Sequence, residues 1–226
     1  MKVNKLIRTI LTALCVLCAL GASAKAKGVA DITMKDGTTF KNVELILPKG
    51  WDSKIKFKDA SEKEVKLESN DVEHIVLWHK DAPEHKALIK YMFTAKYNPK
   101  TNEIDTVPRE KEKWWFTLES AGDHLSYWIC FNEIKPSKKG ITYIIRDCPH
   151  HFVKPEMPDR AFMIVTNSIK PGTIRNWLKG FLADDPVLTE ALNDKGYYNK
   201  KKSLRQGNLY NPYFFEEMAV DYNPKK

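Results

Sequence analysis

The sequence lacks the short motifs by which many enzymes are identified. It contains no Gly-rich phosphate-binding loop, no dinucleotide-binding fingerprint and no Gly-x-Ser-x-Gly elbow around a nucleophilic serine. No Cys-x-x-Cys occurs after residue 24, and the two cysteines found there are too few for a zinc site made of cysteines. Catalysis therefore has no support from motifs, and we expect no cofactor.

Long apolar runs are also scarce, and the one that is present lies at the start of the chain. Lys2, Lys5 and Arg8 precede the apolar stretch Leu11–Leu20, and the small residues Ala22–Ala24 follow it. This order is typical of a secretory signal. We expect residues 1–24 to be a signal peptide that is cleaved after Ala24.

Two alternatives to this cleavage are an uncleaved membrane anchor and lipid attachment at Cys15 or Cys18. The apolar run is short for an anchor. Each cysteine follows a leucine, at a position where a lipoprotein signal would have Gly, Ala or Ser. We therefore expect an exported protein, periplasmic, on the outer surface or secreted, with no stable membrane insertion after the signal is removed.

Charge of one sign is not concentrated anywhere in the chain. The full sequence has 37 basic and 29 acidic residues, a net charge of +8, which falls by three to +5 when the signal is removed. Apart from the short run Lys200–Lys202, the basic residues are dispersed. A nucleic-acid-binding protein would gather them on one face, so we expect no nucleic-acid partner.

Two cysteines, Cys130 and Cys148, remain after the signal. In an oxidising compartment the two thiols can form a disulfide. A buried thiol is the equally supported alternative, because cysteine packs as a small hydrophobic residue.

Residues 31–80 predict a small module of five short strands. The segment Ile32–Phe40 reads I-x-M-x-D-G-x-x-F, where Asp36-Gly37 is a strong hairpin-turn signal. The apolar parity then changes between Phe40 and Val43, which predicts a bulge or a sharp bend. With a later I-x-F strand and the closing strand His74–Trp78, this pattern resembles the small SH3-like or Sm-like barrel. The resemblance implies a barrel-like fold.

Residues 86–226 predict an antiparallel sheet with C-terminal helices, after a linker at Lys80–His85. The centre of this region is a hairpin at Lys113–Glu133, which contains alternating apolar residues on both arms. We place a two-residue type II′ turn at Gly122-Asp123, which sets Phe116 opposite Ile129. The other expected strands are Ala87–Tyr97, Ile141–Arg146 and Arg160–Thr166, with an irregular proline-containing crossing at Asp147–Asp159.

Three helices are expected to follow. The first begins at Pro171 and carries one apolar stripe, formed by Ile174, Trp177, Leu178, Phe181 and Leu182. Asp185 caps the second helix, with Pro186 at its first position, and Asn211-Pro212 opens the third, which ends at Tyr222. The complete chain is therefore expected to be an α+β protein.

The segment Phe181–Leu188 reads F-L-A-D-D-P-x-L, and the last helix ends in Asp221–Asn223. In these segments the chain resembles small exported proteins of unknown function from anaerobic Gram-negative bacteria. The resemblance implies an envelope or secreted location and supplies no activity or catalytic residue.

Tryptophans are the most informative candidates for a binding site. The candidates are Trp51, Trp78, Trp115 and Trp128. In the expected hairpin register Trp115 and Trp128 share one face, where we favour packing beneath the C-terminal helices because large aromatics dominate cores. If they are exposed, they form a platform for a sugar or for an apolar side chain of a partner.

The alternative site is a cluster expected on the irregular segment after Arg146. Its members are Asp147, Cys148, His150 and His151. A loop can bring such ligands together around a metal, although the spacing matches no usual zinc motif. The function expected from the sequence is a non-enzymatic binding or interaction protein of the cell envelope, with an envelope protein or glycan as partner. The alternative is a hydrolase of envelope or glycan material with its site near Asp147–His151.

Overall fold

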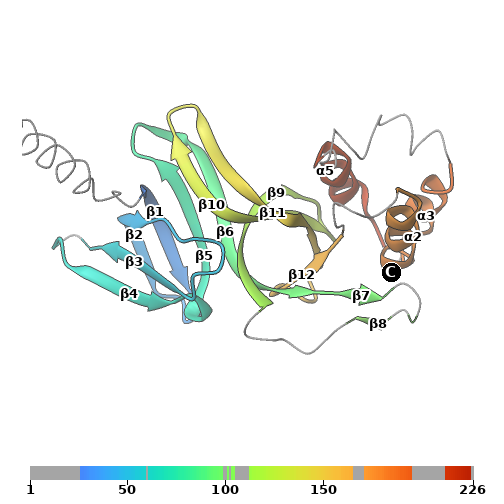
Figure 1. Cartoon of the computed structure of the whole chain (residues 1–226), viewed down its shortest axis with the longest axis horizontal. Coiled ribbons are helices and arrows are strands. Elements are labelled where there is room, and N and C mark those ends of the chain that lie inside the picture. Colours follow the sequence, from blue (N-terminus) through green and yellow to red (C-terminus); the bar gives the residue numbers. More distant parts are fainter. Residues whose placement is uncertain are drawn as a thin grey trace, which may run out of the picture.

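The described part of the chain is dominated by one large sheet, with helices at one end of it (Figure 1). A computed structural model describes residues 26–59, 61–98, 101, 103–104, 112–164, 171–194 and 212–224. Ten strands pair into the sheet, and all pairs except one are antiparallel. The predicted α+β class is therefore confirmed, whereas the predicted signal peptide lies outside the described residues.

Five strands come from the N-terminal region. They are β1 (Lys27–Met34), β2 (Thr39–Ile46), β3 (Lys54–Lys58), β4 (Glu64–Glu68) and β5 (Val72–His79), with a 3-10 turn at Ser69–Asp71 before β5. They pair in the order β5-β1-β2-β3-β4. Among the described residues β4 pairs with β3 alone, so the five strands are as predicted but no pairing closes them into a barrel.

Both local signals in this region are confirmed. Gly37 adopts a φ of +89° in the turn between β1 and β2, a conformation that glycine accepts without strain. The register of β1 against β2 shifts after Ala30, where Asn42 has a φ of 54° and donates its N–H to Asp31 Oδ1 at 2.8 Å. The predicted bulge therefore lies where the apolar parity changes.

Five further strands form the other half of the sheet. They are β6 (Ala82–Ala95), β9 (Lys113–Ala121), β10 (Ser126–Ser137), β11 (Gly140–Val153) and β12 (Arg160–Met163), and the short strands β7 (Tyr97–Asn98) and β8 (Glu103–Ile104) pair separately. β12 pairs with β11 and also, in parallel, with β6. The pairings β6-β9-β10-β11-β12-β6 thus form a closed ring of strands, to which the N-terminal strands attach through β5 and β6.

The residues expected to be a linker are instead a tight connection within the sheet. β5 ends at His79 and β6 begins at Ala82, so Pro83 and His85 lie in a strand. Proline is tolerated near the beginning of a strand. The register between β5 and β6 also shifts between Trp78 and His79.

The central hairpin is present, but its predicted register is wrong by one residue. Phe116 pairs with Cys130 and Leu118 with Trp128, whereas Ile129 was expected opposite Phe116. The connection is the longer loop between Ala121 and Ser126, so no two-residue turn forms. Gly122 is required here for space, because a Cβ on it would meet the carbonyl oxygen of Ala219 at 2.2 Å.

The predicted irregular crossing at Asp147–Asp159 is also corrected, because β11 continues to Val153. The register against β10 changes between Ile145 and His150, where extra residues of β11, including Pro149, form a bulge. A bulge accommodates proline because the bulged residue makes no ladder hydrogen bond. The prolines after this strand do lie in turns.

Three helices are described after the sheet, α2 (Pro171–Phe181), α3 (Pro186–Ala191) and α5 (Pro212–Asp221). The apolar stripe predicted for the first helix is buried on one face of α2. Asp185 caps α3 by accepting the Leu188 N–H at 2.9 Å, as predicted. Within the described residues, no helix combines the length and the apolar character that a membrane span needs.

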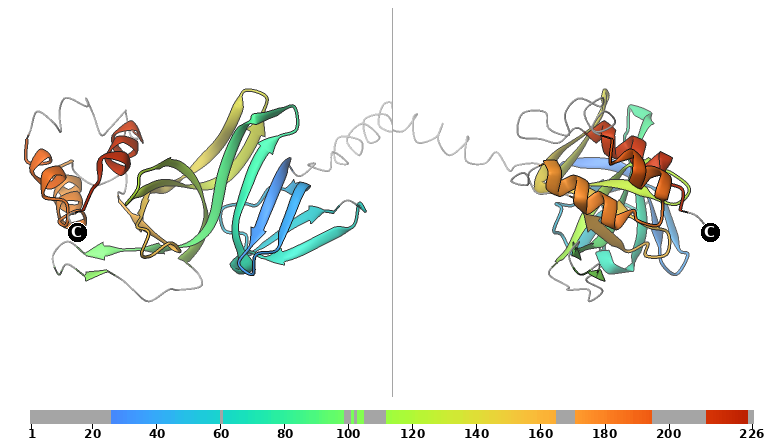
Figure 2. Two further views of the ribbon diagram at one scale, coloured as in Figure 1. Left: turned by 180° about the vertical axis from the view of Figure 1, so that it is seen from behind. Right: turned by 90° about the vertical axis from the view of Figure 1, so that its right-hand side faces the viewer.

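Buried side chains form three clusters, one inside the ring and two outside it. Inside the ring lie Met92, Phe116, Trp128, Cys130, Val153 and Ala161. A second cluster joins the N-terminal strands to the outer face of β6, β9 and β10, and a third joins β10, β11 and β12 to the three helices. The ring therefore lies between the N-terminal strands and the helices, as Figure 2 shows from behind and from one end.

Candidate functional site

The candidate site is built around a short loop that fits into a gap in the sheet. Hydrogen-bond pairing of β9 with β10 ends at Phe116, and beyond this point the backbone of Gly50 lies between the two strands. Gly50 donates its N–H to the Asn132 carbonyl at 2.9 Å and accepts the Trp115 N–H at 2.7 Å. A Cβ at this position would lie 1.9 Å from the carbonyl oxygen of Phe131, so only glycine fits. The loop, residues 47–53, is called the Gly50 loop below.

Further hydrogen bonds hold the Gly50 loop in one conformation. Asp52 accepts the Lys49 N–H through its carboxylate at 2.9 Å. The Asp52 carbonyl accepts the indole N–H of the buried Trp115 at 3.0 Å and the Ser69 hydroxyl at 2.8 Å. These hydrogen bonds thus connect the loop both to β9 and to the turn before β5.

Trp51 projects from this fastened loop and keeps 49% of its surface exposed. Its ring meets the half-buried Trp114 edge to face, with 6.0 Å between ring centroids. The Arg146 guanidinium lies over the Trp114 ring, with its central carbon 3.6 Å from the centroid, and Lys49 Nζ lies 5.5 Å from the Trp51 centroid. The side chains of Lys49, Trp51, Trp114 and Arg146 are called the Trp51 surface below.

Of the four predicted tryptophan candidates, only Trp51 is exposed. Trp78 is 6% exposed, Trp115 is fully buried and Trp128 is 6% exposed. Trp115 packs on Tyr91 in the N-terminal cluster, whereas Trp128 fills the ring. The expected shared face of Trp115 and Trp128 is therefore wrong, because a register change of one residue moves a side chain to the opposite face. Neither packs beneath the C-terminal helices.

Sequence reasoning missed Trp114 and Arg146 as members of the site. The adjacent pair Trp114-Trp115 is visible in the sequence, but which indole faces outward depends on the hairpin register. Arg146 reaches Trp114 from the start of the β11 bulge. No local pattern predicts that bulge.

The two histidines of the alternative site lie on one strand and are both buried. His150 faces the helices, where its Nδ1 lies 2.6 Å from the Tyr127 hydroxyl, and His151 lies against Phe116 inside the ring. Burial lowers the pKa of His150 to about 4 and that of His151 to about 3. Since neighbours on a strand point to opposite faces, the two imidazoles do not converge.

Asp147 is exposed at the bulge, and the side chain of Cys148 lies outside the described part of the structure. Within the described part, no group of three or more His, Cys, Asp or Glu side chains is arranged to hold a metal ion. The metal site at Asp147, Cys148, His150 and His151 remains a prediction. The described side chains of this set do not converge on one point.

Cys130 is buried inside the ring. It lies between Ile129 and Phe131, directly opposite the bulge of β11 that contains Cys148. The two cysteines therefore belong to neighbouring strands, although Cys148 was expected just past its strand, and a disulfide between them remains a prediction.

A separate cluster of titratable groups lies where α5 contacts the sheet. Glu119 of β9 accepts a hydrogen bond from Tyr143, and burial raises the pKa of Glu119 to about 7, with a smaller contribution from the charge of Glu216. Burial also raises the pKa of Glu216. Ser120 donates its hydroxyl to the Glu216 carbonyl at 3.2 Å. Two carboxyl groups thus share a poorly solvated contact between β9 and α5.

Replacing Glu119 by glutamine is expected to stabilise the protein at high pH and to have almost no effect at low pH. A carboxyl whose pKa is higher in the folded protein than its ordinary 4.5 destabilises the fold as the pH rises through 4.5 to 7. The gain at pH 8 is about 2 kcal/mol after allowance for partial solvation. Urea unfolding at pH 4 and pH 8 measures it, with the exposed Glu133→Gln as control. Equal effects of Glu119→Gln at the two pH values would contradict the assignment.

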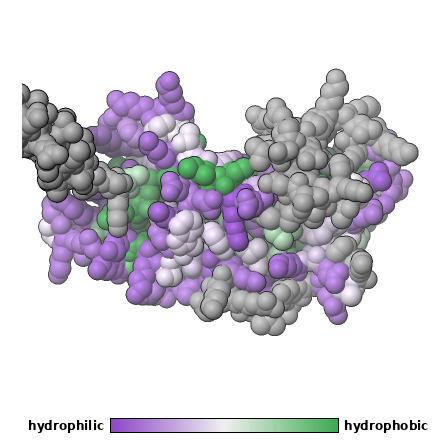
Figure 3. All heavy atoms as spheres, viewed as in Figure 1, coloured by the Kyte–Doolittle hydropathy of each residue, from purple (hydrophilic) through white to green (hydrophobic). Residues whose placement is uncertain are grey.

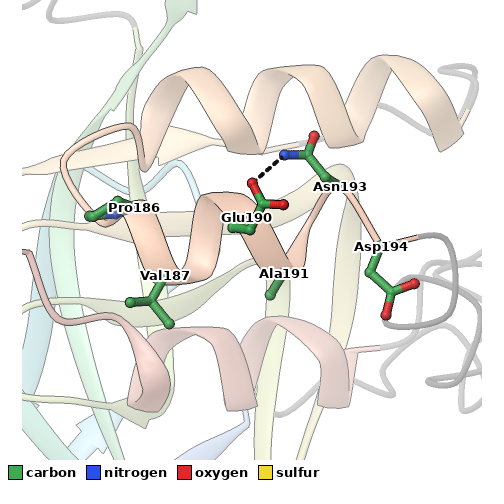
Figure 4. Close-up of a pocket in the computed structure, with 6 residues that line it drawn as sticks. All are labelled: Pro186, Val187, Glu190, Ala191, Asn193 and Asp194. Atoms are coloured by element: carbon green, nitrogen blue, oxygen red, sulfur yellow. Dashed lines mark hydrogen bonds between the residues drawn. The ribbon is translucent and has the colours of Figure 1, made fainter.

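A shallow groove of about 680 Å³ follows α3 at the C-terminal end of the molecule (Figure 4). It is lined by Pro186, Val187, Glu190, Ala191, Asn193 and Asp194. Glu190 accepts a hydrogen bond from Asn193 at 3.1 Å. Its lining contains two carboxylates, Glu190 and Asp194, but no aromatic side chain, so it lacks the stacking surface that Trp51 offers.

The face seen in Figure 3 is mostly hydrophilic, and hydrophobic residues reach it only in small separate areas.

Comparison with protein-family models, with characterised proteins and with solved structures gave no match to this chain.

Proposed function

We propose that this protein is an exported, non-enzymatic binding protein of the cell envelope and that it binds its ligand at the Trp51 surface. The observation that carries the proposal is Trp51 itself, a half-exposed indole on a loop that several hydrogen bonds fix in place. A fixed aromatic side chain binds with little loss of conformational entropy. Binding residues are commonly found on loops that a rigid scaffold positions.

The proposed location rests on the first 24 residues, with their basic start, short apolar stretch and small residues before the expected cleavage at Ala24. In this proposal the N-terminal strands act as a barrel-like module that carries the Gly50 loop. The C-terminal helices act as a cover for the other end of the sheet. The mixed cluster of sheet and helix residues supports the second part.

The hydrolase alternative has less support. Its best base would be His150 or His151, and both are buried with pKa values well below neutral. A general base works best when its pKa is near the working pH and it can reach a substrate. Neither condition is met by these two side chains.

Replacing Trp51 by alanine is expected to reduce ligand binding at least tenfold while leaving the fold intact. Truncation of an aromatic anchor commonly costs more than 1 kcal/mol of binding energy, and about 1.4 kcal/mol corresponds to the tenfold loss. The mature protein, residues 25–226, is immobilised and offered purified envelope glycans and an envelope extract. Val187→Ala is the control, because Val187 is 74% exposed in the distant helix α3. Equal retention of every component by wild type and Trp51→Ala would refute the proposal, provided that thermal unfolding shows both folded.

A further inference from the structure

We propose that the ligand of the Trp51 surface is a carboxylate-bearing sugar, held by stacking on Trp51 and by a charge-assisted hydrogen-bond pair to Arg146. This inference rests on the proposed function and specifies its ligand. Three observations carry it: the way Arg146 lies on Trp114, the lack of an ion pair to Arg146 or Lys49 among the described residues, and the small size of the aromatic surface.

The first observation is the geometry of Arg146. The central carbon of the guanidinium lies 3.6 Å from the indole centroid of Trp114, which is a stacking distance over the face of the ring. Stacking uses the face of the guanidinium and leaves its N–H donors at the edge, within its plane. That edge is the fork that binds a carboxylate through two parallel hydrogen bonds.

The second observation concerns charge. Many cations of this protein have an acidic partner, such as Lys54 with Glu68 at 2.8 Å and Lys154 with Asp184 at 3.0 Å. Across the described ranges, by contrast, no carboxylate lies within 4.0 Å of the charged groups of Arg146 or Lys49. Asp52 of the same loop uses its carboxylate to accept the backbone N–H of Lys49. In the described part of the chain, the two cations thus flank a pair of indoles without forming an ion pair. The ligand that satisfies them carries negative charge.

The third observation is the shape of the surface. Trp51 and Arg146 both contact Trp114, so one small ligand can reach them together. The other strongly exposed large apolar residues of the described part are Ile144 in β11 and Val187 and Val220 in the C-terminal helices, and none of these is aromatic. A stable protein partner needs a larger continuous patch than one exposed indole. A sugar ring needs only an aromatic face for its C–H groups and polar groups at its rim, and the Trp51 surface has both.

Calorimetric titration with oligogalacturonate and with its carboxyl-reduced counterpart tests the inference. The two probes share their ring shape and differ by the carboxylate. We expect the mature protein to bind the acidic oligomer at least tenfold more tightly. Arg146→Gln should remove that preference while Trp51→Ala weakens both ligands. Lys139→Gln is the matched control, because it removes one exposed positive charge from the β10–β11 turn.

The outcomes separate this inference from the proposed function. Equal binding of both oligomers that still depends on Trp51 would overturn the carboxylate assignment and leave the binding function in place. An unchanged preference in Arg146→Gln would overturn the role of Arg146. Binding of neither oligomer, or preference for a glycerol-phosphate polymer or a single-stranded oligonucleotide, would overturn the ligand class.

Discussion

Replacing Gly50 by alanine is expected to lower the free energy of unfolding by about 3 kcal/mol and to abolish binding at the Trp51 surface. The new methyl group would overlap the carbonyl oxygen of Phe131, which belongs to the backbone and cannot rotate away. The loop must then leave the gap between β9 and β10. Loss of its two backbone hydrogen bonds and the strain of overpacking together reach this magnitude. Urea unfolding followed by circular dichroism gives the free energy.

The control for this substitution is Gly172→Ala. Gly172 lies in the first turn of α2, and a Cβ there would meet nothing within 4 Å. Alanine favours helix over glycine by up to about 1 kcal/mol, so this variant should be as stable as the wild type or slightly more stable. If Gly50→Ala were equally well tolerated, the Gly50 loop would not occupy the gap and the Trp51 surface would lose its support.

Replacing Asp185 by alanine is expected to cost about 3 kcal/mol of stability. This carboxylate is 3% exposed and accepts two backbone N–H groups, that of Leu188 at 2.9 Å and that of Asn223 at 2.8 Å. The first bond caps α3, which is worth about 1 kcal/mol. The second holds the end of the chain against the α2–α3 turn, and a buried donor left without its acceptor costs about 1–3 kcal/mol. Thermal and urea unfolding measure the total.

Asp185→Asn sharpens this test. The asparagine side chain has one carbonyl oxygen, which can accept a hydrogen bond from one of the two N–H groups. Its NH₂ group would face the other N–H, so we expect about half of the stability loss of Asp185→Ala. Asp123→Ala, in the exposed loop of the hairpin, is the control and should change stability by less than about 0.5 kcal/mol. An Asp185→Ala variant as stable as Asp123→Ala would mean that the chain end does not pack as described.

Features set by neighbouring residues were predictable from the sequence. The φ of Gly37, the proline after the Asp185 cap and the buried stripe of α2 each follow from the conformational preference of one short segment. The bulge near Asn42 was predictable for the same reason, since a change of apolar parity within one strand requires an extra residue.

Features set by distant contacts were not predictable. Gly122 suited a turn, yet the structure requires glycine there because the backbone of α5 lies against it. Because the turn was misplaced, the predicted hairpin register was wrong. The predicted side of the sheet for each tryptophan was wrong for the same reason. Pro149 suggested an irregular segment, whereas β11 continues past it and accommodates it in a bulge opposite the paired strand β10.

The candidate site shows the same division. Trp51 was a candidate from its position in a loop, but its neighbours Trp114 and Arg146 come from strands far along the chain. Likewise, the two segments that carry the resemblance to exported proteins meet in space. Asp184 accepts the Tyr222 hydroxyl at 2.5 Å, and Asp185 accepts the Asn223 N–H. Their separation in the sequence gives no indication of this contact.

The closed ring of strands also bears on how the chain reaches its fold. Closure requires β12 to pair with β6, and the paired residues Arg160 and Phe93 are separated by about half of the sheet-forming sequence. Contacts between such distant residues must overcome a large loss of chain entropy before they contribute stability, so they form late and folding is slow. If the protein is exported as we propose, slow closure would keep the newly made chain open while it crosses the membrane. The last strand of the ring would then complete the fold on the far side.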